Sequence, residues 1–209
     1  MPVWVKICGI TNVDDARTAI DAGADAIGVN LIATSKRYVS FDVARSLHEV
    51  AAGRAEVIAV VADLPLEELL RVRRETGIAW LQLHGHEPTE ALLPLLPEAY
   101  KAVPIATAED VEHASAFAGE RLLTDAKVEG ALGGTGQRFD WDLVRALATK
   151  RRLILAGGLG PSNVREAVRA LGPFGVDVAS GVESGDPRRK DSDKVFTFVA
   201  EAKAASEGR

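Results

Sequence analysis

The chain has 209 residues, of which 47% are hydrophobic and 26% charged, and its formal net charge is −5. This balance is typical of a globular domain, and it argues against a nucleic-acid partner, which calls for a basic face. No apolar run approaches the roughly 20 residues that span a bilayer, and a single cysteine excludes an intrachain disulfide and the multi-cysteine zinc sites. We therefore expect one domain over residues 1–209 in a reducing cytoplasm, with no membrane partner.

Short apolar runs alternate with longer amphipathic stretches along the whole chain. Residues 3–8 are predicted to form a strand, and residues 12–23 a helix that Thr11 or Asn12 caps and Gly23 ends. This unit of one strand followed by one helix recurs seven times. Further strands are predicted at 26–32, 56–62, 79–85, 99–105, 121–126, 152–158 and 176–181, and further helices at 42–52, 65–77, 88–96, 108–118, 140–150, 162–172 and 191–205.

The strands are nearly continuous runs of valine, isoleucine and leucine, which is typical of a parallel sheet covered by helices. Eight strand–helix units is the count at which such a sheet closes into a barrel. The alternative is an open doubly wound sheet, which has a G-x-G-x-x-G loop after its first strand. This chain has "CGITN" there, so we predict a single (β/α)8 barrel, the TIM barrel, with eight parallel strands.

In such a barrel, functional groups lie at the carboxyl ends of the strands, and side chains alternate between the interior and the helices. This alternation groups several polar side chains inside the barrel near that end. They are Lys6, Cys8, Gln82, His84, Asp125 and Asp177, of which Gln82, His84 and Asp177 are candidate substrate-binding residues.

Each of these residues also has a structural interpretation. A lone cysteine in an apolar strand is most often a small core residue. A lysine inside a barrel needs a carboxylate, so Lys6 is expected to form an ion pair with Asp125 or Asp177. Capping of the next helix and catalysis are equally good interpretations of Asp125. The simplest interpretation of His84 is a histidine at the rim of the barrel whose hydrogen bonds are made within the protein.

Glycine-rich segments follow the last three strands: "EGALGGTGQRFDW", "AGGLGPSN" and "ASGVESGD". Glycines let backbone N–H groups approach an anion, and the loops after strands seven and eight are the usual phosphate site of this fold. Tight turns are the alternative explanation. The candidate phosphate-binding residues are Gly134, Gly157, Gly158, Ser180 and Gly181. No acidic cluster suits Mg²⁺, so we expect phosphate binding without a metal.

The segment "TSKRYVS" follows the second strand and places Arg37 at the same rim. A planar guanidinium can bind a carboxylate through two parallel hydrogen bonds. The alternative is an exposed loop arginine, the commoner fate of a single arginine.

The motifs "KICGIT", "QLHG", "LLTDA" with "GGTGQRFDW", "LAGGL" with "PSNV", and "VDVASGVE" resemble those of phosphoribosylanthranilate isomerase, in the same order. The resemblance implies an Amadori rearrangement of N-(5-phosphoribosyl)anthranilate in tryptophan biosynthesis, without a cofactor. We expect the protein to be a monomer or a homodimer. The resemblance also implies that Cys8 is the general base, Asp125 the general acid, and Arg37 the contact of the anthranilate carboxylate. The chain departs from the usual family pattern at Lys36, where a proline is common, and at Ala179, where a serine is common.

The chemistry fits these residues. Opening the ribose ring requires an acid, for which Asp125 is placed, and the resulting Schiff base has an acidic C2′ hydrogen that a Cys8 thiolate beside Lys6 can remove. Three alternatives remain at this point. They are a class I aldolase that uses Lys6 or Lys101, a phosphate-binding barrel without activity, and the related histidine-pathway isomerase, which relies on two aspartates.

Overall fold

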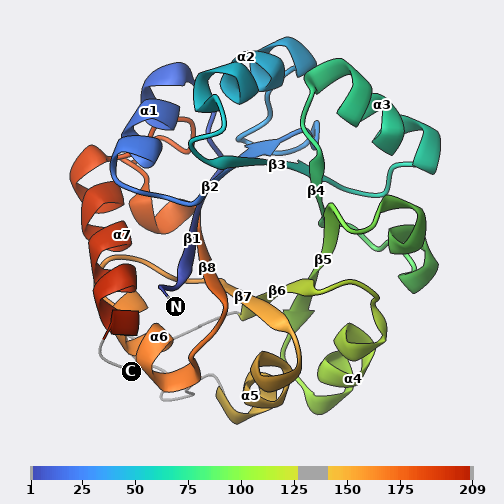
Figure 1. The fold of residues 1–209 in the computed structure, drawn as a ribbon, viewed down its shortest axis with the longest axis vertical. Coiled ribbons are helices and arrows are strands. Elements are labelled where there is room, and N and C mark those ends of the chain that lie inside the picture. The colour runs from blue at the N-terminus through green and yellow to red at the C-terminus, as the bar shows by residue number, and fades with distance from the viewer. Residues whose placement is uncertain (1, 127–140, 208–209) are drawn as a thin grey trace.

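A computed structural model, which describes residues 2–126 and 141–207, shows a closed barrel of parallel strands surrounded by helices (Figure 1). Each strand pairs with the next, and the last pairs with the first. The predicted (β/α)8 barrel is confirmed. The strands are β1 (Trp4–Cys8), β2 (Ala26–Asn30), β3 (Glu56–Val61), β4 (Trp80–Leu83), β5 (Ala99–Ile105), β6 (Arg121–Ala126), β7 (Arg152–Ala156) and β8 (Gly175–Val178).

The helices cover the outside of the barrel. They are α1 (Val13–Asp21), α2 (Phe41–Ala51), α3 (Leu66–Thr76), α4 (Ala108–Ala116), α5 (Trp141–Lys150), α6 (Val164–Leu171) and α7 (Ser192–Glu207), together with the short 3₁₀ turn η2 (Ser180–Val182).

The first helix illustrates how the local sequence sets these bounds. Asn12 is its N-cap, and the Asn12 side chain accepts a hydrogen bond of 2.9 Å from the Asp15 backbone N–H. Gly23, with φ of +88°, follows the last turn in the left-handed region that glycine adopts without strain. Thr11 does not cap the helix, because its hydroxyl donates to the Arg188 carbonyl instead.

The connection between β4 and β5 differs from the prediction. Residues 88–96 were expected to form an α-helix, but the structure has the 3₁₀ helix η1 (Thr89–Leu95) with Pro94 inside it. Proline has no N–H for the i→i−4 ladder, so an α-helix cannot run through this segment undisturbed. Leu92 and Leu95 are both buried at the three-residue spacing of a 3₁₀ turn.

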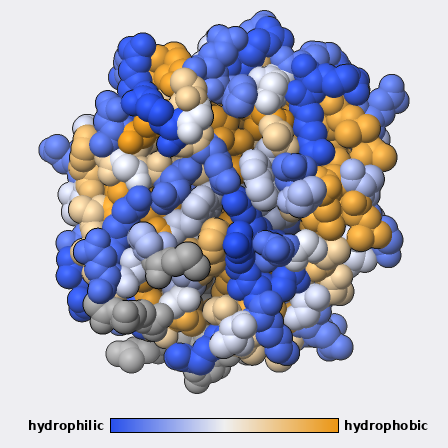
Figure 2. Space-filling model, in the orientation of Figure 1, coloured by the Kyte–Doolittle hydropathy of each residue, from blue (hydrophilic) through white to orange (hydrophobic). Residues whose placement is uncertain are grey.

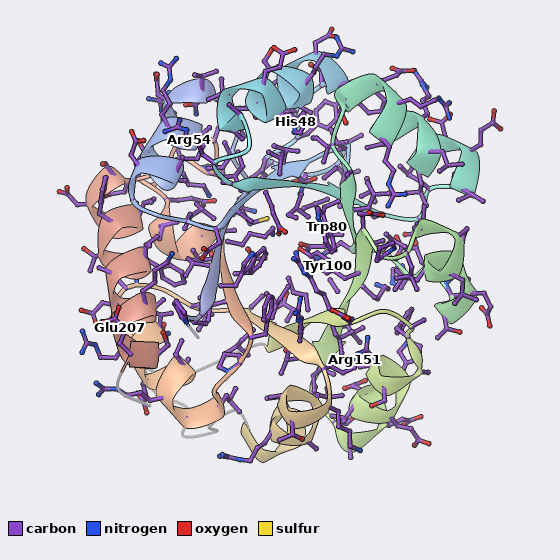
Figure 3. All side chains as sticks on the ribbon, viewed as in Figure 1. His48, Arg54, Trp80, Tyr100, Arg151 and Glu207 are labelled. Carbon is purple, nitrogen blue, oxygen red and sulfur yellow. The ribbon has the colours of Figure 1, made fainter. Side chains whose placement is uncertain are left out.

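The apolar core has two layers, as the strand alternation predicts. Val5 and Ile7 face the helices and belong to the large outer cluster. A smaller cluster fills the barrel interior, with Tyr100 and Ile58 fully buried in it. Figure 3 shows Tyr100 and Trp80 within the ring of strands.

The amino-terminal end of the barrel is closed by aromatic rings around one arginine. The Arg121 guanidinium lies 3.9 Å from the Trp80 ring centroid and 5.2 Å from that of Trp4. Glu56 binds this guanidinium through two hydrogen bonds of 2.7 and 2.9 Å. This end is therefore packed, and the open end is the one at which the strands finish.

Figure 2 shows a face on which hydrophilic residues predominate and hydrophobic ones gather in separate patches. Within residues 2–126 and 141–207, no helix is long and apolar enough to cross a membrane.

Candidate active site

A cavity of about 320 Å³ opens at the carboxyl ends of the strands. Residues from β1, β2, β4, β6 and β8 and from the loops that follow them contribute to its wall. Those with polar groups or glycine backbones are Cys8, Asn30, Arg37, Gln82, His84, Asp125, Gly157, Gly158, Asp177 and Ser180. The structure thus brings most of the sequence-predicted site residues to one cavity.

Cys8 ends β1 and is partly exposed in this cavity. Its neighbour in the sheet is Gly28 of β2. A Cβ atom at Gly28 would lie 2.8 Å from the Cys8 Sγ and 2.9 Å from the Lys6 Cε. Glycine at this position therefore provides the space in which the thiol and the lysine stem lie together.

Lys6 is completely buried and forms an ion pair inside the barrel. Its Nζ donates to both carboxylate oxygens of Asp177 at 3.0 Å and to the Gln82 Oε1 at 3.1 Å. Burial lowers the pKa of Lys6, but the negative charges of Asp177 and Cys8 outweigh it and raise the pKa above the ordinary value. Lys6 is therefore a permanent ammonium, and of its two predicted partners the structure selects Asp177.

His84 and Asp125 both line the cavity, and His84 is exposed. The Gln82 amide nitrogen is 3.1 Å from the His84 Nδ1. Desolvation by the surrounding protein lowers the pKa of His84, and the charge of Asp125 partly offsets this effect. Asp125 lies near the end of β6, opposite Ala156 of β7, and is half-buried.

Arg37 reaches the cavity from the loop between β2 and α2. Its Nε donates to Glu183 at 2.6 Å, and its stem lies against Gly9, where a Cβ atom would be 2.3 Å from the Arg37 Cδ. Lys36 is exposed and does not line the cavity. Of the two neighbouring cations, Arg37 is the one that lines the cavity.

The glycine-rich loop after β7 turns back on itself beside the cavity. Gly157 and Gly158 have φ of +91° and +63°, in the left-handed region. The Asn163 side chain fixes the loop, because its Nδ2 donates to the Gly158 carbonyl at 2.9 Å and its Oδ1 accepts from the Gly160 N–H at 2.8 Å. Backbone groups of this loop thereby take a defined position at one end of the cavity.

The loop after β8 packs against the loop after β7. A Cβ atom at Gly181 would lie 2.0 Å from the Leu159 carbonyl oxygen, so only glycine permits this approach. Ser180 lines the cavity, whereas Gly181 faces the neighbouring loop. Gly134, also predicted for phosphate binding, lies outside the described residues.

Two polar residues near the site were not found from the sequence. Asn30 ends β2 and lines the cavity, and the strand-end rule would have indicated it. The Lys190 Nζ donates to the Ala179 carbonyl at 3.1 Å and to Glu183 at 3.4 Å. Burial lowers the pKa of Lys190, and the charge of Cys8 opposes that effect. Lys190 follows no strand directly, so no local pattern placed it near Cys8.

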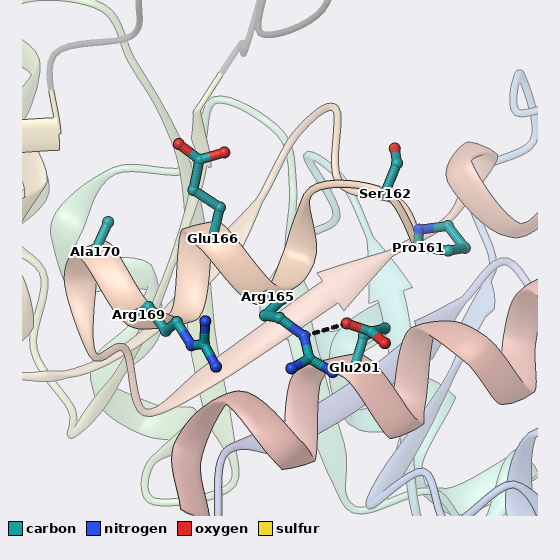
Figure 4. Close-up of a pocket in the computed structure, with 7 residues that line it drawn as sticks. All are labelled: Pro161, Ser162, Arg165, Glu166, Arg169, Ala170 and Glu201. Carbon is teal, nitrogen blue, oxygen red and sulfur yellow. Dashed lines mark hydrogen bonds and ion pairs between the residues drawn. The ribbon is translucent and has the colours of Figure 1, made fainter. Parts of the chain in front are cut away.

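Among the described residues, no three histidine, cysteine, aspartate or glutamate side chains are grouped as a metal site requires. A second hollow of about 510 Å³ lies on the outer surface between α6 and α7 (Figure 4). Arg165 and Glu201 pair with each other across it. None of the strand-end residues lines this hollow, so we place the candidate site in the barrel cavity.

The comparisons with known proteins agree on one family. The family model described as N-(5'phosphoribosyl)anthranilate (PRA) isomerase matches residues 5–201. The N-(5'-phosphoribosyl)anthranilate isomerase of Myxococcus xanthus is 40% identical over 98% of both chains, and that of Desulforudis audaxviator is 39% identical over 96% of this chain and 98% of the relative.

Solved structures give the same result. Phosphoribosylanthranilate isomerase from Thermotoga maritima has a TM-score of 0.85 at 36% identity, covering 97% of this chain and 99% of that one. A structure of the isomerase in complex with reduced 1-(o-carboxyphenylamino)-1-deoxyribulose 5-phosphate has a TM-score of 0.83 at 34% identity over the same shares of the two chains. The chain belongs to the N-(5'-phosphoribosyl)anthranilate isomerase family.

Proposed function

We propose that the protein converts N-(5'-phosphoribosyl)anthranilate to 1-(2-carboxyphenylamino)-1-deoxyribulose 5-phosphate, the Amadori step of tryptophan biosynthesis. The observation that carries this proposal is the match to the isomerase family over nearly the whole chain. The cavity supports it, because a thiol, a carboxyl group, an arginine and two glycine-rich loops line the same space.

The substrate has an anionic group at each end, a phosphate and a carboxylate. In our proposal the loops that contain Gly157, Gly158 and Ser180 bind the phosphate through backbone N–H groups and a hydroxyl. Gly181 contributes by allowing the two loops to meet. Arg37 binds the anthranilate carboxylate, and two fixed anion sites then hold the ribose between them.

In our proposal catalysis proceeds through proton transfers by Asp125 and Cys8. Asp125 donates a proton to the ribose ring oxygen, the C1′–oxygen bond breaks, and the anthranilate nitrogen lone pair forms the Schiff base. The Cys8 thiolate then removes the C2′ hydrogen, and the electron pair moves toward the nitrogen to give an enolamine. The Cys8 thiol then gives its proton to C1′, and the Asp125 carboxylate takes the C2′ hydroxyl proton. These two transfers give the ketose and restore both groups, so that substrate and product are isomers.

Lys6 and Lys190 are cationic groups that interact electrostatically with Cys8. The charge of Cys8 acts to raise the pKa of both lysines. Asp177 holds Lys6 below Cys8. In our proposal these residues set the charge around the base without touching the substrate.

The aldolase alternative is disfavoured by both candidate lysines. A Schiff-base lysine must lose its proton easily, whereas Asp177 raises the pKa of Lys6 despite its burial. Burial does lower the pKa of Lys101. However, its Nζ donates to the carbonyls of Leu83, Gly85 and Ala102, and Lys101 does not line the cavity that the substrate would enter. Borohydride with substrate is expected to trap no enzyme-linked imine.

The deciding assay follows the fall of phosphoribosylanthranilate fluorescence with chromatographic detection of the ketose product. Cys8→Ala is expected to lower kcat/KM by about 10²–10⁴-fold, the contribution of a general base, while its melting temperature stays close to that of the parent. Exposed Lys36→Ala is the matched control. Absence of turnover by the parent protein, or turnover of the histidine-pathway aminoaldose at a comparable rate, would contradict the proposal.

A monomer and a homodimer are both proposed forms, and sedimentation distinguishes them.

A further inference from the structure

Three buried polar residues, Lys6, Gln82 and Tyr100, are linked by hydrogen bonds in the barrel interior below the cavity. Not all of them take part in the proposed proton transfers. Lys6 and Tyr100 have no exposed surface, and Gln82 is 2% exposed. The Tyr100 hydroxyl donates to the Gln82 Oε1 at 3.0 Å, and the Lys6 Nζ donates to the same oxygen at 3.1 Å. Neither Tyr100 nor Gln82 has a part in the transfers from Asp125 or to Cys8.

The Lys6 ammonium fixes which way the Gln82 amide points. An amide oxygen and nitrogen are usually told apart only by their hydrogen-bond partners. A lysine ammonium has donors and no acceptor, so the group that it contacts must be the oxygen. The amide nitrogen therefore faces the His84 Nδ1, 3.1 Å away.

This orientation determines the tautomer of His84. The amide nitrogen only donates, so Nδ1 must accept and the ring proton lies on Nε2. A second ring proton, on Nδ1, would face the Gln82 amide N–H, so that two hydrogen-bond donors would point at each other. Around the ring, desolvation, Lys6 and Lys101 lower the pKa of His84, Asp125 and Asp177 raise it, and the net effect is a lowered pKa.

We propose that Gln82 is a positioning residue that holds His84 as the neutral Nε2–H tautomer, and that this N–H donates to an oxygen of the substrate ribosyl group. His84 lines the cavity, and its Nε2 has no hydrogen-bond partner among the described residues. The substrate contact rests on the proposed function, whereas the tautomer follows from the protein alone.

A neutral donor suits a site that already has an acid and a base. An imidazolium at this position would be a second acid beside Asp125 and would attract the Cys8 thiolate. The neutral N–H instead stabilises negative charge that develops on a sugar oxygen, and it keeps its proton. The hydrogen bonds from Tyr100 and Lys6 to Gln82, and from Gln82 to His84, therefore keep His84 as a hydrogen-bond donor. Proton transfer is left to Asp125 and Cys8.

The first test needs no substrate. Long-range proton–nitrogen NMR of the full-length, nitrogen-15-labelled protein distinguishes the two neutral tautomers and the cation of each of the four histidines. The His84 signals are identified by their loss in His84→Asn. We expect the Nε2–H form at neutral pH, with titration below the range of a free imidazole. An Nδ1–H form or an imidazolium at neutral pH would overturn the inference.

Two variants at one position test the role of Gln82. Gln82→Glu keeps the shape and the acceptor for Lys6 and Tyr100, but it replaces the donor with an oxygen, so the His84 proton should move to Nδ1 and the titration should shift upward. Gln82→Met removes both groups and should give a mixture of tautomers. In Tyr100→Phe, Lys6 still orients the amide, so the Nε2–H form should persist.

Kinetics then connect the tautomer with the reaction. Loss of one neutral hydrogen bond should lower kcat/KM of Gln82→Met by about threefold to tenfold, and the pH profile of Gln82→Glu should shift with the His84 titration. An unchanged tautomer in Gln82→Glu refutes the positioning role. If the parent protein does not turn over the substrate, the proposed function fails while the NMR result still decides the tautomer.

Discussion

Replacement of Lys6 by methionine tests the buried ion pair on which the barrel interior depends. The side chains of Lys6 and Asp177 are 0% and 8% exposed, and the shortest distance between their charged atoms is 3.0 Å. Lys6→Met leaves the Asp177 carboxylate in the interior without its partner. The loss of one member of a buried pair costs about 3–5 kcal/mol of the free energy of unfolding. At about 2–4 °C per kcal/mol for a chain of this size, the melting temperature should fall by roughly 6–20 °C.

Two controls separate this effect from general damage. Exposed Arg54 pairs with Asp21 at 3.3 Å, with side chains 53% and 61% exposed, and Arg54→Ala should cost about 1 kcal/mol or less. The double variant Lys6→Met/Asp177→Leu removes both charges and should cost much less than the sum of the single variants. Urea unfolding followed by circular dichroism measures the parent, Arg54→Ala, the two single variants Lys6→Met and Asp177→Leu, and the double variant.

The pH dependence gives a further check. The pKa of Lys6 is raised in the folded state, so its stabilisation is complete below the unfolded value of 10.5 and is lost only as the pH rises through the higher folded value. The titration of Lys6 should therefore add no pH dependence of its own to the stability of the parent through neutral pH. If Lys6→Met costs no more than Arg54→Ala, or if the Lys6 and Asp177 changes are additive, our account of the interior is wrong.

Three substitutions around the cavity have separate expected outcomes. Asp125→Asn should lower kcat by about 10²–10⁴-fold, and an unchanged kcat would place the acid elsewhere. Arg37→Ala should raise KM by about tenfold to a hundredfold through loss of a charge-assisted contact, whereas Lys36→Ala should not; the reverse order would exchange their roles. Gly28→Ala places a Cβ atom 2.8 Å from the Cys8 Sγ, and kcat/KM should fall by up to about 10²-fold because the thiol is displaced. Turnover of Gly28→Ala at the parent rate would show that the thiol position is not critical.

The barrel could be predicted because its signals are local and repeated. Eight apolar runs, each followed by an amphipathic helix, leave few other topologies, and the two-residue period of a strand assigns each side chain to a face. Lys6 and Gln82 accordingly lie inside, and Val5 and Ile7 face the helices. Motif order then indicated the family, because the motifs extend over most of the chain.

Other features required three-dimensional contacts. Residues 88–96 have leucines at spacings that also fit an α-helix, and Pro94 decided the outcome through its missing N–H. The charge of Cys8 acts on Lys190, which is distant in the sequence, and no pattern near either residue indicates this electrostatic interaction. The need for glycine at position 28 depends on side chains of the neighbouring strand. The direction of the Gln82 amide depends on an ammonium that lies 76 positions away in the sequence.

The partner of Lys6 shows how closure of the barrel distributes chemical roles. The sequence allowed Asp125 or Asp177, both on interior faces of their strands. Closure pairs β8 with β1 and sets Asp177 directly opposite Lys6, whereas Asp125 lies on β6, which pairs with β5 and β7 instead. Asp177 therefore remains tied to the buried ammonium, and Asp125 is left at the rim without that cation. Two carboxylates in different surroundings can perform different tasks, and our proposal gives the structural task to Asp177 and the proton transfer to Asp125.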